Sequence, residues 1–420
     1  MTAIVGVLNK RAAVMAADSA VTVTNGNKRK IYNTATKIFK LSEEYPVGVM
    51  IYNAVEFMET PWDVIIKMYA KKRGNQCFDH LAEYVDDFID FLKTAPVYVE
   101  PETANHTYLQ REMCSYYEDI KQKVTDRITE EYEANPEAYQ DEEELNALAR
   151  KLVTEEIAKN SKEFEEVDVC SEFEDYSLNV FCNYAMEEFN LLMKQCKEDD
   201  IPASTRYDWE KGLYAHIIHE VMYNYTGLVF VGYGEKEIFP SMFPVNISGF
   251  IDGRLRYYLS ENQVVQISND RVAELMPFAQ YDVIQTIMRG VAPELYDFIR
   301  YSYMESMEEQ KEMLIKIAKE NDAPGTLLQK MHEMDSEEMY KKFDEDILKF
   351  VRKSYVDGII DALDSFNIED MGNLAESLIS ITNLQRHITS SEESVGGPVD
   401  VAVITRSDGF VWLKHKNELS

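Results

Sequence analysis

The sequence predicts an α+β fold. Short runs of β-branched and small residues occur at the amino end, in the middle and at the carboxyl end of the 420-residue chain, and turn residues bound each run, which is typical of strands. Two long blocks between these runs repeat apolar residues at helical spacing. Runs of strands separated by runs of helices favour an α+β arrangement over alternating strand and helix units.

Five strands are predicted at the amino end. They cover residues 2–8, 12–17, 21–24, 37–41 and 47–52. Polar or glycine-containing segments separate them, as expected for strands joined by turns. The alanines of the second run allow a neighbouring layer to approach closely.

The middle and the carboxyl end add further strands. Between residues 227 and 267, four short apolar runs separated by turn residues predict an antiparallel meander. A final hairpin is predicted from residues 399–404 and 410–413, which flank a turn.

Helical blocks are predicted at about residues 56–225 and 277–386. The stretch 130–166 is the most densely charged part of these blocks. A solvated helical face is the simpler interpretation of this stretch, and a docking surface for a partner is the alternative.

The chain is strongly acidic. Its 75 Asp and Glu against 43 Lys and Arg give a formal net charge of -32, so we expect neither a nucleic acid nor an anionic membrane as partner. No long apolar run and no amino-terminal signal pattern occur, which favours a cytoplasmic protein. The five cysteines show no C-x-x-C spacing, and neither a disulfide framework nor a zinc knuckle is expected.

The amino terminus carries a chemically useful pair of groups. Thr2 follows the initiator methionine, which is usually removed before a small residue. The new terminus then holds a hydroxyl beside an α-amine, whose pKa of roughly 7.7 to 8.0 lets it act as a base near neutral pH. A lysine nearby lowers the pKa of both groups, and an aspartate holds that lysine in place. Asp18 and Lys37 supply this pair if their strands lie side by side in one sheet.

Several segments together resemble the proteasome β subunits and the related bacterial peptidase that works with an ATP-driven unfoldase. At the amino end they are Thr2-Ala-Ile-Val-Gly-Val, Ala12-Ala-Val-Met-Ala-Ala-Asp18-Ser19, Lys37-Ile-Phe-Lys-Leu and Gly48-Val-Met-Ile-Tyr. At the carboxyl end they are Ser394-Val-Gly-Gly-Pro-Val-Asp-Val-Ala-Val-Ile404 and Asp408-Gly-Phe-Val-Trp412. The resemblance implies a four-layer αββα sandwich of two antiparallel sheets, the N-terminal nucleophile (Ntn) hydrolase type, with large α-helical insertions.

The resemblance also implies catalytic roles for the residues that match. Thr2 is implied as the nucleophile and, through its α-amine, as the base. Lys37 is implied as the electrostatic modulator and Asp18 as the partner of this lysine. The implied reaction passes through an acyl ester on the threonine that water then cleaves.

Five further residues are implied as supports of the site. The oxyanion amide of the family lies just after the strand at residues 47–52, so the implied donor is the backbone N–H of Tyr52 or Asn53. Before the last hairpin, the family places an acidic residue and a serine that support the α-amine. Glu392, Glu393 and Ser394 lie in that segment, with an ambiguity of one residue in register.

The chain departs from the family in two places. Tyr52 and Asn53 stand where the family has glycines, and their side chains would narrow a substrate cleft. Residues 276–281 stand where the family has a Ser-Gly loop, with Gln280 as a substitute polar partner.

The resemblance divides the chain into core segments and insertions. The core is predicted at residues 1–70, 226–291 and 370–420, and the helical insertions at 71–225 and 292–369. Because an ordinary β subunit has no counterpart of the insertions, we expect them to cap the site, replace ring contacts or bind a protein partner.

No metal or cofactor is expected. His216 and His219 lie near one face of a predicted helix, but neither a third ligand nor an H-E-x-x-H pattern accompanies them. Gly232-Tyr-Gly234 lacks the Gly-Lys-Ser or Gly-Lys-Thr of a phosphate-binding loop.

Three functions are consistent with these observations. The leading hypothesis is a threonine-type hydrolase of a peptide or an amide, assembled as a homo-oligomer by analogy with the family. One alternative is a catalytically silent proteasome-like subunit or partner-binding scaffold, because Tyr52, Asn53 and the acidic insertions depart from the family. The other is a non-proteolytic hydrolase of a small amide, with the insertions closing the cleft.

Overall fold

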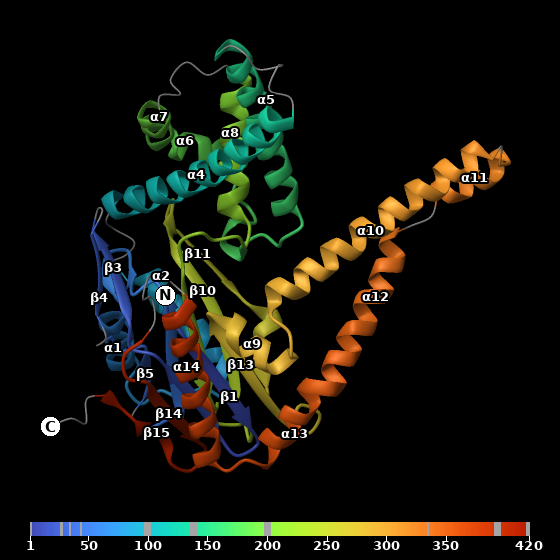
Figure 1. Cartoon of the computed structure of the whole chain (residues 1–420). Helices are drawn as coiled ribbons and strands as arrows, with labels where there is room; N and C mark the ends of the chain where they lie inside the picture. The colour runs from blue at the N-terminus through green and yellow to red at the C-terminus, as the bar shows by residue number, and fades with distance from the viewer. Residues whose placement is uncertain are drawn as a thin grey trace. The chain divides into compact units, whose positions relative to one another are not determined.

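The computed structural model shows a mixed α+β protein with antiparallel sheets, as the sequence predicts (Figure 1). The chain divides into two compact units, which are Met1–Ile38, Ile238–Ser241 and Gln266–Ser420 for the first and Phe39–Glu237 and Met242–Val265 for the second. The structure describes residues 2–25, 28–32, 35–42, 44–95, 102–134, 142–196, 203–321, 323–333, 336–389 and 396–416.

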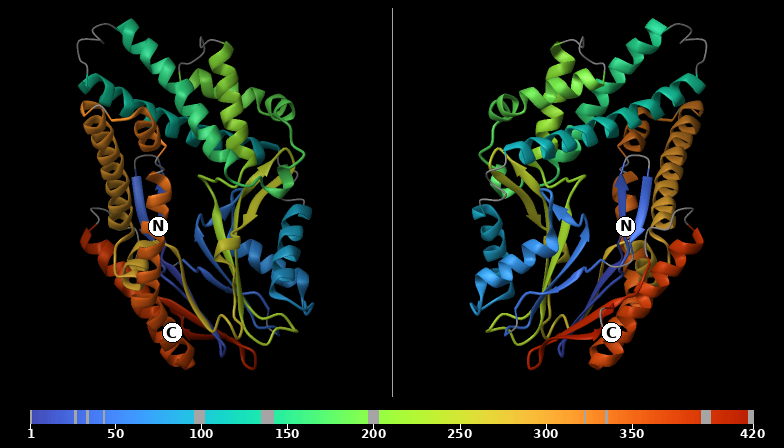
Figure 2. Two further views of the ribbon diagram at one scale, coloured as in Figure 1. Left: turned by 90° about the vertical axis from the view of Figure 1, so that its right-hand side faces the viewer. Right: turned by 90° about the vertical axis from the view of Figure 1, so that its left-hand side faces the viewer.

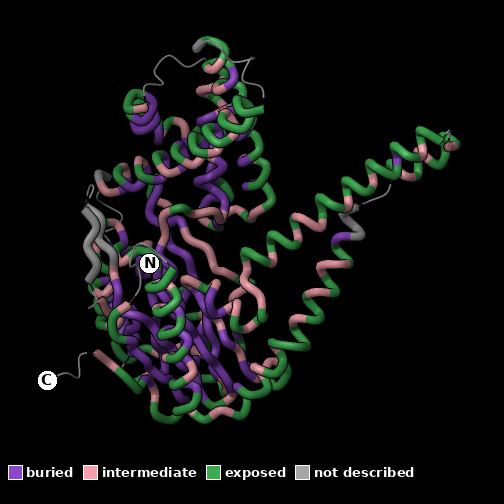
Figure 3. Tube along the Cα trace, in the orientation of Figure 1, coloured by how far each residue is buried: buried purple, intermediate pink, exposed green. Residues whose placement is uncertain are grey.

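A five-stranded antiparallel sheet forms the centre of the first unit. Its strand order is β13-β1-β2-β14-β15, and β1, β2 and β14 are buried along their whole length (Figure 3). The helix α14 (Ile368–Thr389) packs across β1, β2 and β14, and Ala16 of β2 lies in the same apolar cluster as α14. The strands are β1 (Ile4–Asn9), β2 (Ala13–Ala17), β13 (Ala273–Ala279), β14 (Asp400–Thr405) and β15 (Gly409–Lys414).

The core of the first unit lies between this sheet and its helices. The side chains of Ile284 on α9 (Tyr281–Arg289) and Leu363 on α13 (Asp357–Ser365) join the apolar residues of β1, β2 and β14 in one cluster. Burial of this continuous apolar surface is the main stabilising contribution to the unit.

Two smaller elements complete the first unit. The predicted strand at residues 21–24 is β3 (Val21–Asn25), which pairs with β4 (Lys28–Tyr32) as a separate ribbon. The helices α10 (Pro293–Glu320), α11 (Gly325–His332) and α12 (Ser336–Val351) form a helical arm that leads through a π-helical turn into α13 (Figure 1). Tyr303 on α10 stacks on Phe343 of α12 at a ring separation of 3.9 Å, which joins the two long helices.

Most of a six-stranded sheet lies in the second unit. Its order is β11-β10-β9-β6-β5, with β12 paired to β10, so the predicted meander is present as β9, β10 and β11. The helices α1 (Trp62–Arg73) and α2 (Leu81–Thr94) bury their apolar faces with this sheet in one core. The strands are β5 (Ile38–Lys40), β6 (Val47–Asn53), β9 (Thr226–Gly232), β10 (Ser241–Ile251), β11 (Arg254–Leu259) and β12 (Val265–Gln266), with β7 (Glu56–Phe57) and β8 (Thr60–Pro61) as a small separate hairpin.

A second, aromatic-rich core lies among the remaining helices of this unit. The helix α5 packs against both α4 and α8 (Figure 2), and rings such as those of Tyr116, Tyr117 and Trp209 fill the space between them. The helices are α4 (Glu102–Ala134), α5 (Glu142–Glu165), α6 (Leu178–Tyr184), α7 (Met186–Gln195) and α8 (Ala203–Ile218).

A buried polar cluster joins these helices to the sheet. Glu112 of α4 accepts hydrogen bonds from Arg256 of β11 at 2.9 Å and from His216 of α8 at 3.2 Å, and all three side chains are fully buried. Burial lowers the pKa of His216, while the Glu112 carboxylate opposes this shift. Because a buried charge is costly without its partner, the cluster holds α4, α8 and β11 in one arrangement.

One prediction about local structure is wrong, and one condition stated for the site is not met. The second helical block does not begin at Pro277, because β13 continues to Ala279 and α9 begins at Tyr281. A proline is tolerated there because β13 is an edge strand that pairs only with β1 within the five-stranded sheet. The strand predicted at residues 37–41 is present as β5, but it belongs to the six-stranded sheet, so the condition that it lies beside the strand of Asp18 in one sheet is not met.

Among the described residues, no helix combines the length and the apolar composition needed to cross a membrane.

Candidate active site

The β1–β2 hairpin places Asp18 beside the amino terminus. Ile4 lies opposite Ala17 in the strand register, so Ala3 and Asp18 meet at the open end of the hairpin. The backbone N–H of Ala3 donates to Oδ1 of Asp18 at 2.9 Å, and the N–H of Asp18 donates to the carbonyl of Ala3 at 3.1 Å. Asp18 therefore forms two hydrogen bonds with Ala3, the residue that follows Thr2. Thr2 itself is 6% exposed.

Lys37 completes a buried ion pair at this point. Its Nζ lies 2.7 Å from Oδ1 of Asp18, with side-chain exposures of 1% for the lysine and 0% for the aspartate. Burial lowers the pKa of Lys37, and the attraction and hydrogen bond of Asp18 oppose that shift. The pair forms although Lys37 precedes a strand of a different sheet, so the proximity comes from the segment before β5.

The Asp18 carboxylate is saturated with donors. Its Oδ2 accepts the backbone N–H of Gly396 at 3.2 Å and that of Ala20 at 3.3 Å, in addition to the two donors on Oδ1. The carboxylate is thereby fixed in orientation toward Lys37.

The loop before β14 contacts Asp18 and Ser19. Besides the bond from Gly396 to Asp18, the N–H of Ser19 donates to the carbonyl of Gly396 at 3.3 Å, and its hydroxyl donates to the carbonyl of Pro398 at 2.7 Å. The predicted supports Glu392, Glu393 and Ser394 lie just before this loop and outside the described residues.

The two predicted oxyanion residues belong to the second unit. Tyr52 and Asn53 end β6, where they lie opposite Gly227 and Thr226 of β9. The Tyr52 ring is buried against Gly227, which has no side chain to obstruct it, and its hydroxyl donates to Oδ1 of Asn246 at 3.2 Å. Asn53 is exposed and has a positive φ of 66°, a conformation that breaks the regular strand.

The segment at residues 276–281 is partly strand. Gln280 is the N-cap residue of α9 and has a left-handed conformation with φ of 51°. Its Oε1 accepts a hydrogen bond from Nε of Arg386 at 3.0 Å. Its Nε2 is buried without a partner among the described residues. Arg386 also pairs with Asp282, so Gln280 is held in place by α14.

Three residues of this region were not identified from the sequence: Ser19 as a hydrogen-bonding centre, Asp400 and Lys416. Asp400 and Lys416 form an ion pair at 3.2 Å, with side-chain exposures of 1% and 7%. No local sequence pattern indicates the contact between Lys416 and Ser19, because the two residues are 397 positions apart. A charged residue in a carboxyl-terminal segment is ordinarily solvated.

The two histidines considered as metal ligands have other partners. His216 belongs to the buried Glu112 cluster, and His219 contacts the carbonyl of Ala215. No group of three or more metal-binding side chains gathers in the part of the chain that the structure describes.

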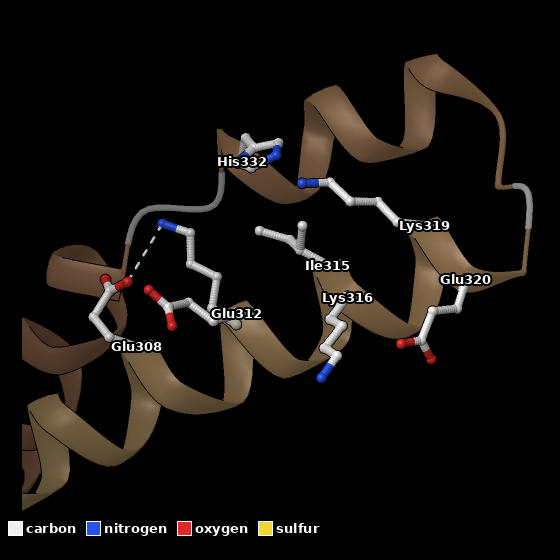
Figure 4. A pocket seen from close by; sticks show the side chains of 8 residues that line it. Glu308, Glu312, Ile315, Lys316, Lys319, Glu320 and His332 are labelled. Carbon is white, nitrogen blue, oxygen red and sulfur yellow. Dashed lines mark ion pairs between the residues drawn. The ribbon is translucent and has the colours of Figure 1, made fainter.

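A hollow of about 510 Å³ lies between α10 and α11 (Figure 4). Its charged lining is balanced between glutamates and lysines, so it attracts neither anions nor cations strongly. Its lining residues are Glu308, Lys311, Glu312, Ile315, Lys316, Lys319, Glu320 and His332.

No family model matches the chain, and no curated protein matches it. Among solved structures, the chain is similar to a Gly-1 mutant of Anbu from Hyphomicrobium sp. strain MC1, with 9% sequence identity, a TM-score of 0.29, and coverage of 99% of this chain and 85% of that chain. A TM-score this low does not establish a common fold.

Proposed function

We propose that this chain is an N-terminal nucleophile hydrolase of the threonine type, which cleaves an amide or peptide bond with Thr2 once Met1 is removed. The observation that carries the proposal is the buried pair of Asp18 and Lys37, bonded to the residue directly after Thr2. The four-layer αββα arrangement implied by the sequence resemblance is part of the same proposal.

The lysine supplies the electrostatic component of the proposed site. A cation near a hydroxyl and an α-amine favours their deprotonated forms, and it acts more strongly where water is excluded. Lys37 is 1% exposed and Asp18 compensates its burial, so its ammonium group is held in a fixed position. In this proposal Lys37 makes the Thr2 hydroxyl a better nucleophile and keeps the amine neutral.

The reaction then needs only groups of Thr2 and water. The neutral α-amine takes the hydroxyl proton while Oγ attacks the carbonyl carbon of the substrate. As the carbon–nitrogen bond breaks, the ammonium returns this proton to the departing amine, and an acyl ester remains on Oγ. A water molecule, deprotonated by the same α-amine, cleaves the ester, which releases the carboxylic acid and restores Thr2.

The remaining predicted site residues have supporting roles in this proposal. The backbone N–H of Tyr52 or Asn53 is proposed to stabilise the oxyanion, a contribution of a few kcal/mol, roughly 2.7 to 4 in the measured case of a side-chain donor. Glu392, Glu393 and Ser394 are proposed to support the α-amine.

A catalytically silent subunit is the second candidate function. Tyr52 and Asn53 favour it, because they stand where the family has glycines and their side chains would narrow a substrate cleft. An amino terminus that keeps Met1 would support the silent subunit, because a blocked α-amine cannot act as the base.

Intact-mass measurement of the purified protein distinguishes the two functions. We expect loss of Met1 and, after incubation with an epoxyketone or β-lactone directed at terminal threonines, one stoichiometric adduct. The variant Thr2→Ser should keep the adduct because it retains a hydroxyl beside the amine, and Thr2→Ala should lose it. A mass that retains Met1 and shows no adduct would instead establish the silent subunit.

A further inference from the structure

The carboxyl-terminal segment reaches the candidate site through Lys416. Its Nζ donates to Oγ of Ser19 at 3.3 Å and to the carbonyl of Ala35, and it lies 3.2 Å from Oδ2 of Asp400. With a side-chain exposure of 7%, this lysine is buried with its charge compensated by one carboxylate. All these residues belong to the first unit.

The two other partners of Lys416 flank the buried pair. Ser19 directly follows Asp18, and Ala35 precedes Lys37 by two positions. The carbonyl of Ser19 also accepts the N–H of Ala35 at 3.1 Å. One ammonium group therefore binds both of the segments that bring Asp18 and Lys37 together.

The Asp400 carboxylate binds both the backbone N–H and the side chain of Lys416. The carboxylate accepts the N–H of Lys416 at 2.9 Å and contacts Nδ1 of His415 at 3.1 Å. The His415 ring stacks on Trp412 at a centroid distance of 4.1 Å. Asp400 itself begins β14 opposite Ala17, the residue before Asp18, so the second ion pair is anchored in the same sheet as the first.

We propose that Lys416, held by Asp400, is a positioning residue for the Thr2 site, which fixes the Ser19 and Ala35 segments so that Asp18 presents Lys37 to the amino terminus. This inference rests on the proposed function, because Lys37 has a catalytic task only if Thr2 is the nucleophile.

The positive charge of Lys416 distinguishes the proposed positioning role, which also affects Lys37, from structural support of the Ser19 and Ala35 segments alone. A neutral donor would bridge Ser19 and Ala35 equally well, whereas an ammonium group repels that of Lys37. After burial, which is the main cause of the lowered pKa of Lys37 and which Asp18 opposes, the charge of Lys416 lowers that pKa further. Removing Lys416 therefore changes both the geometry and the titration of Lys37.

The test compares Lys416→Met with Lys414→Met. Lys414 is a matched control because it lies two residues away at the end of β15, is exposed, and pairs with Glu376 at the surface. The titration of Lys37 is followed by NMR of protein labelled with ¹³C at the lysine ε-carbon, with the signal assigned through Lys37→Arg. The rate of adduct formation with the threonine-directed probe is measured across pH.

In Lys416→Met, we expect the pKa of Lys37 to rise and the alkaline fall of the adduct rate to move to higher pH. The rate itself should fall by about tenfold to a hundredfold, the usual effect of a misplaced catalytic group. Lys414→Met should match the wild type in both measurements. Wild-type titration and a wild-type rate profile in Lys416→Met would overturn the inference and leave the proposed function intact.

Two further arms keep the outcomes distinct. If the wild-type protein forms no adduct, the proposed function fails, and the NMR titration alone then decides whether Lys416 controls Lys37. If Lys416→Met does not fold, the double variant Asp400→Asn with Lys416→Met removes both charges and leaves no unpaired carboxylate buried. A wild-type adduct rate in that variant would exclude a positioning role.

Discussion

The buried pair of Asp18 and Lys37 offers a quantitative test of the candidate site by a double-mutant cycle. Asp18→Asn leaves the Lys37 ammonium, which is 1% exposed, without its anion, and Lys37→Met leaves the fully buried carboxylate without its cation. Breaking a buried pair from one side costs about 3 to 5 kcal/mol. The total stability of a domain is only about 5 to 15 kcal/mol, so each single variant should lose a large part of it.

The double variant should be less destabilised than the two single costs together. With neither charge present, no buried ion lacks a partner, and the coupling between the two positions should be about 1 to 3 kcal/mol. The amide oxygen introduced by Asp18→Asn can still accept the N–H of Ala3, so the hairpin itself should persist in both aspartate variants.

Hydrogen exchange of peptides from β1 and β2, measured by mass spectrometry at increasing urea concentrations, reports the free energy of unfolding of this unit by itself. The exposed pair Asp63 and Lys67 on α1, at 3.0 Å, is a suitable control cycle. Its coupling, read from α1 peptides, should be about 0.3 to 0.5 kcal/mol. Additivity of the Asp18 and Lys37 variants within about 0.5 kcal/mol would refute the buried contact.

Two further predictions concern the second unit, and a third, a glycine substitution on α13 of the first unit, is the control for the glycine substitution on α8. The stability of this unit should fall as the pH drops below about 6.5, because burial lowers the pKa of His216 and the unfolded chain then binds a proton that the folded unit does not. His216→Gln should flatten this slope in urea unfolding, and an unchanged slope would assign it to other groups. Gly212→Ala on α8 should cost about 1 to 3 kcal/mol, because the new Cβ would lie 2.3 Å from the Tyr116 hydroxyl. Gly358→Ala on α13, with no atom within 4 Å, should instead gain up to about 1 kcal/mol from helix propensity, and equal effects at the two glycines would contradict this packing.

The sequence by itself determined the elements whose pattern is local. The hairpin of β1 and β2, the meander of β9 to β11 and the final hairpin of β14 and β15 follow from short β-branched runs with turns between them. The position of Asp18 beside the start of the chain follows as well, because a tight hairpin fixes which residues stand opposite each other. Where the local signal is ambiguous, as at Pro277 in the edge strand β13, the sequence indicates the wrong element.

Only the tertiary structure decided which distant segments meet at the site. Lys37 was expected to reach Asp18 through neighbouring strands of one sheet, whereas the contact comes from a segment that precedes a strand of the other sheet. The approach of Lys416 to Ser19 and the burial of Arg256 against Glu112 join positions 397 and 144 residues apart. Periodicity and turn residues report conformation over a few residues, but contacts of this range depend on strand order and on which charges the completed core can compensate.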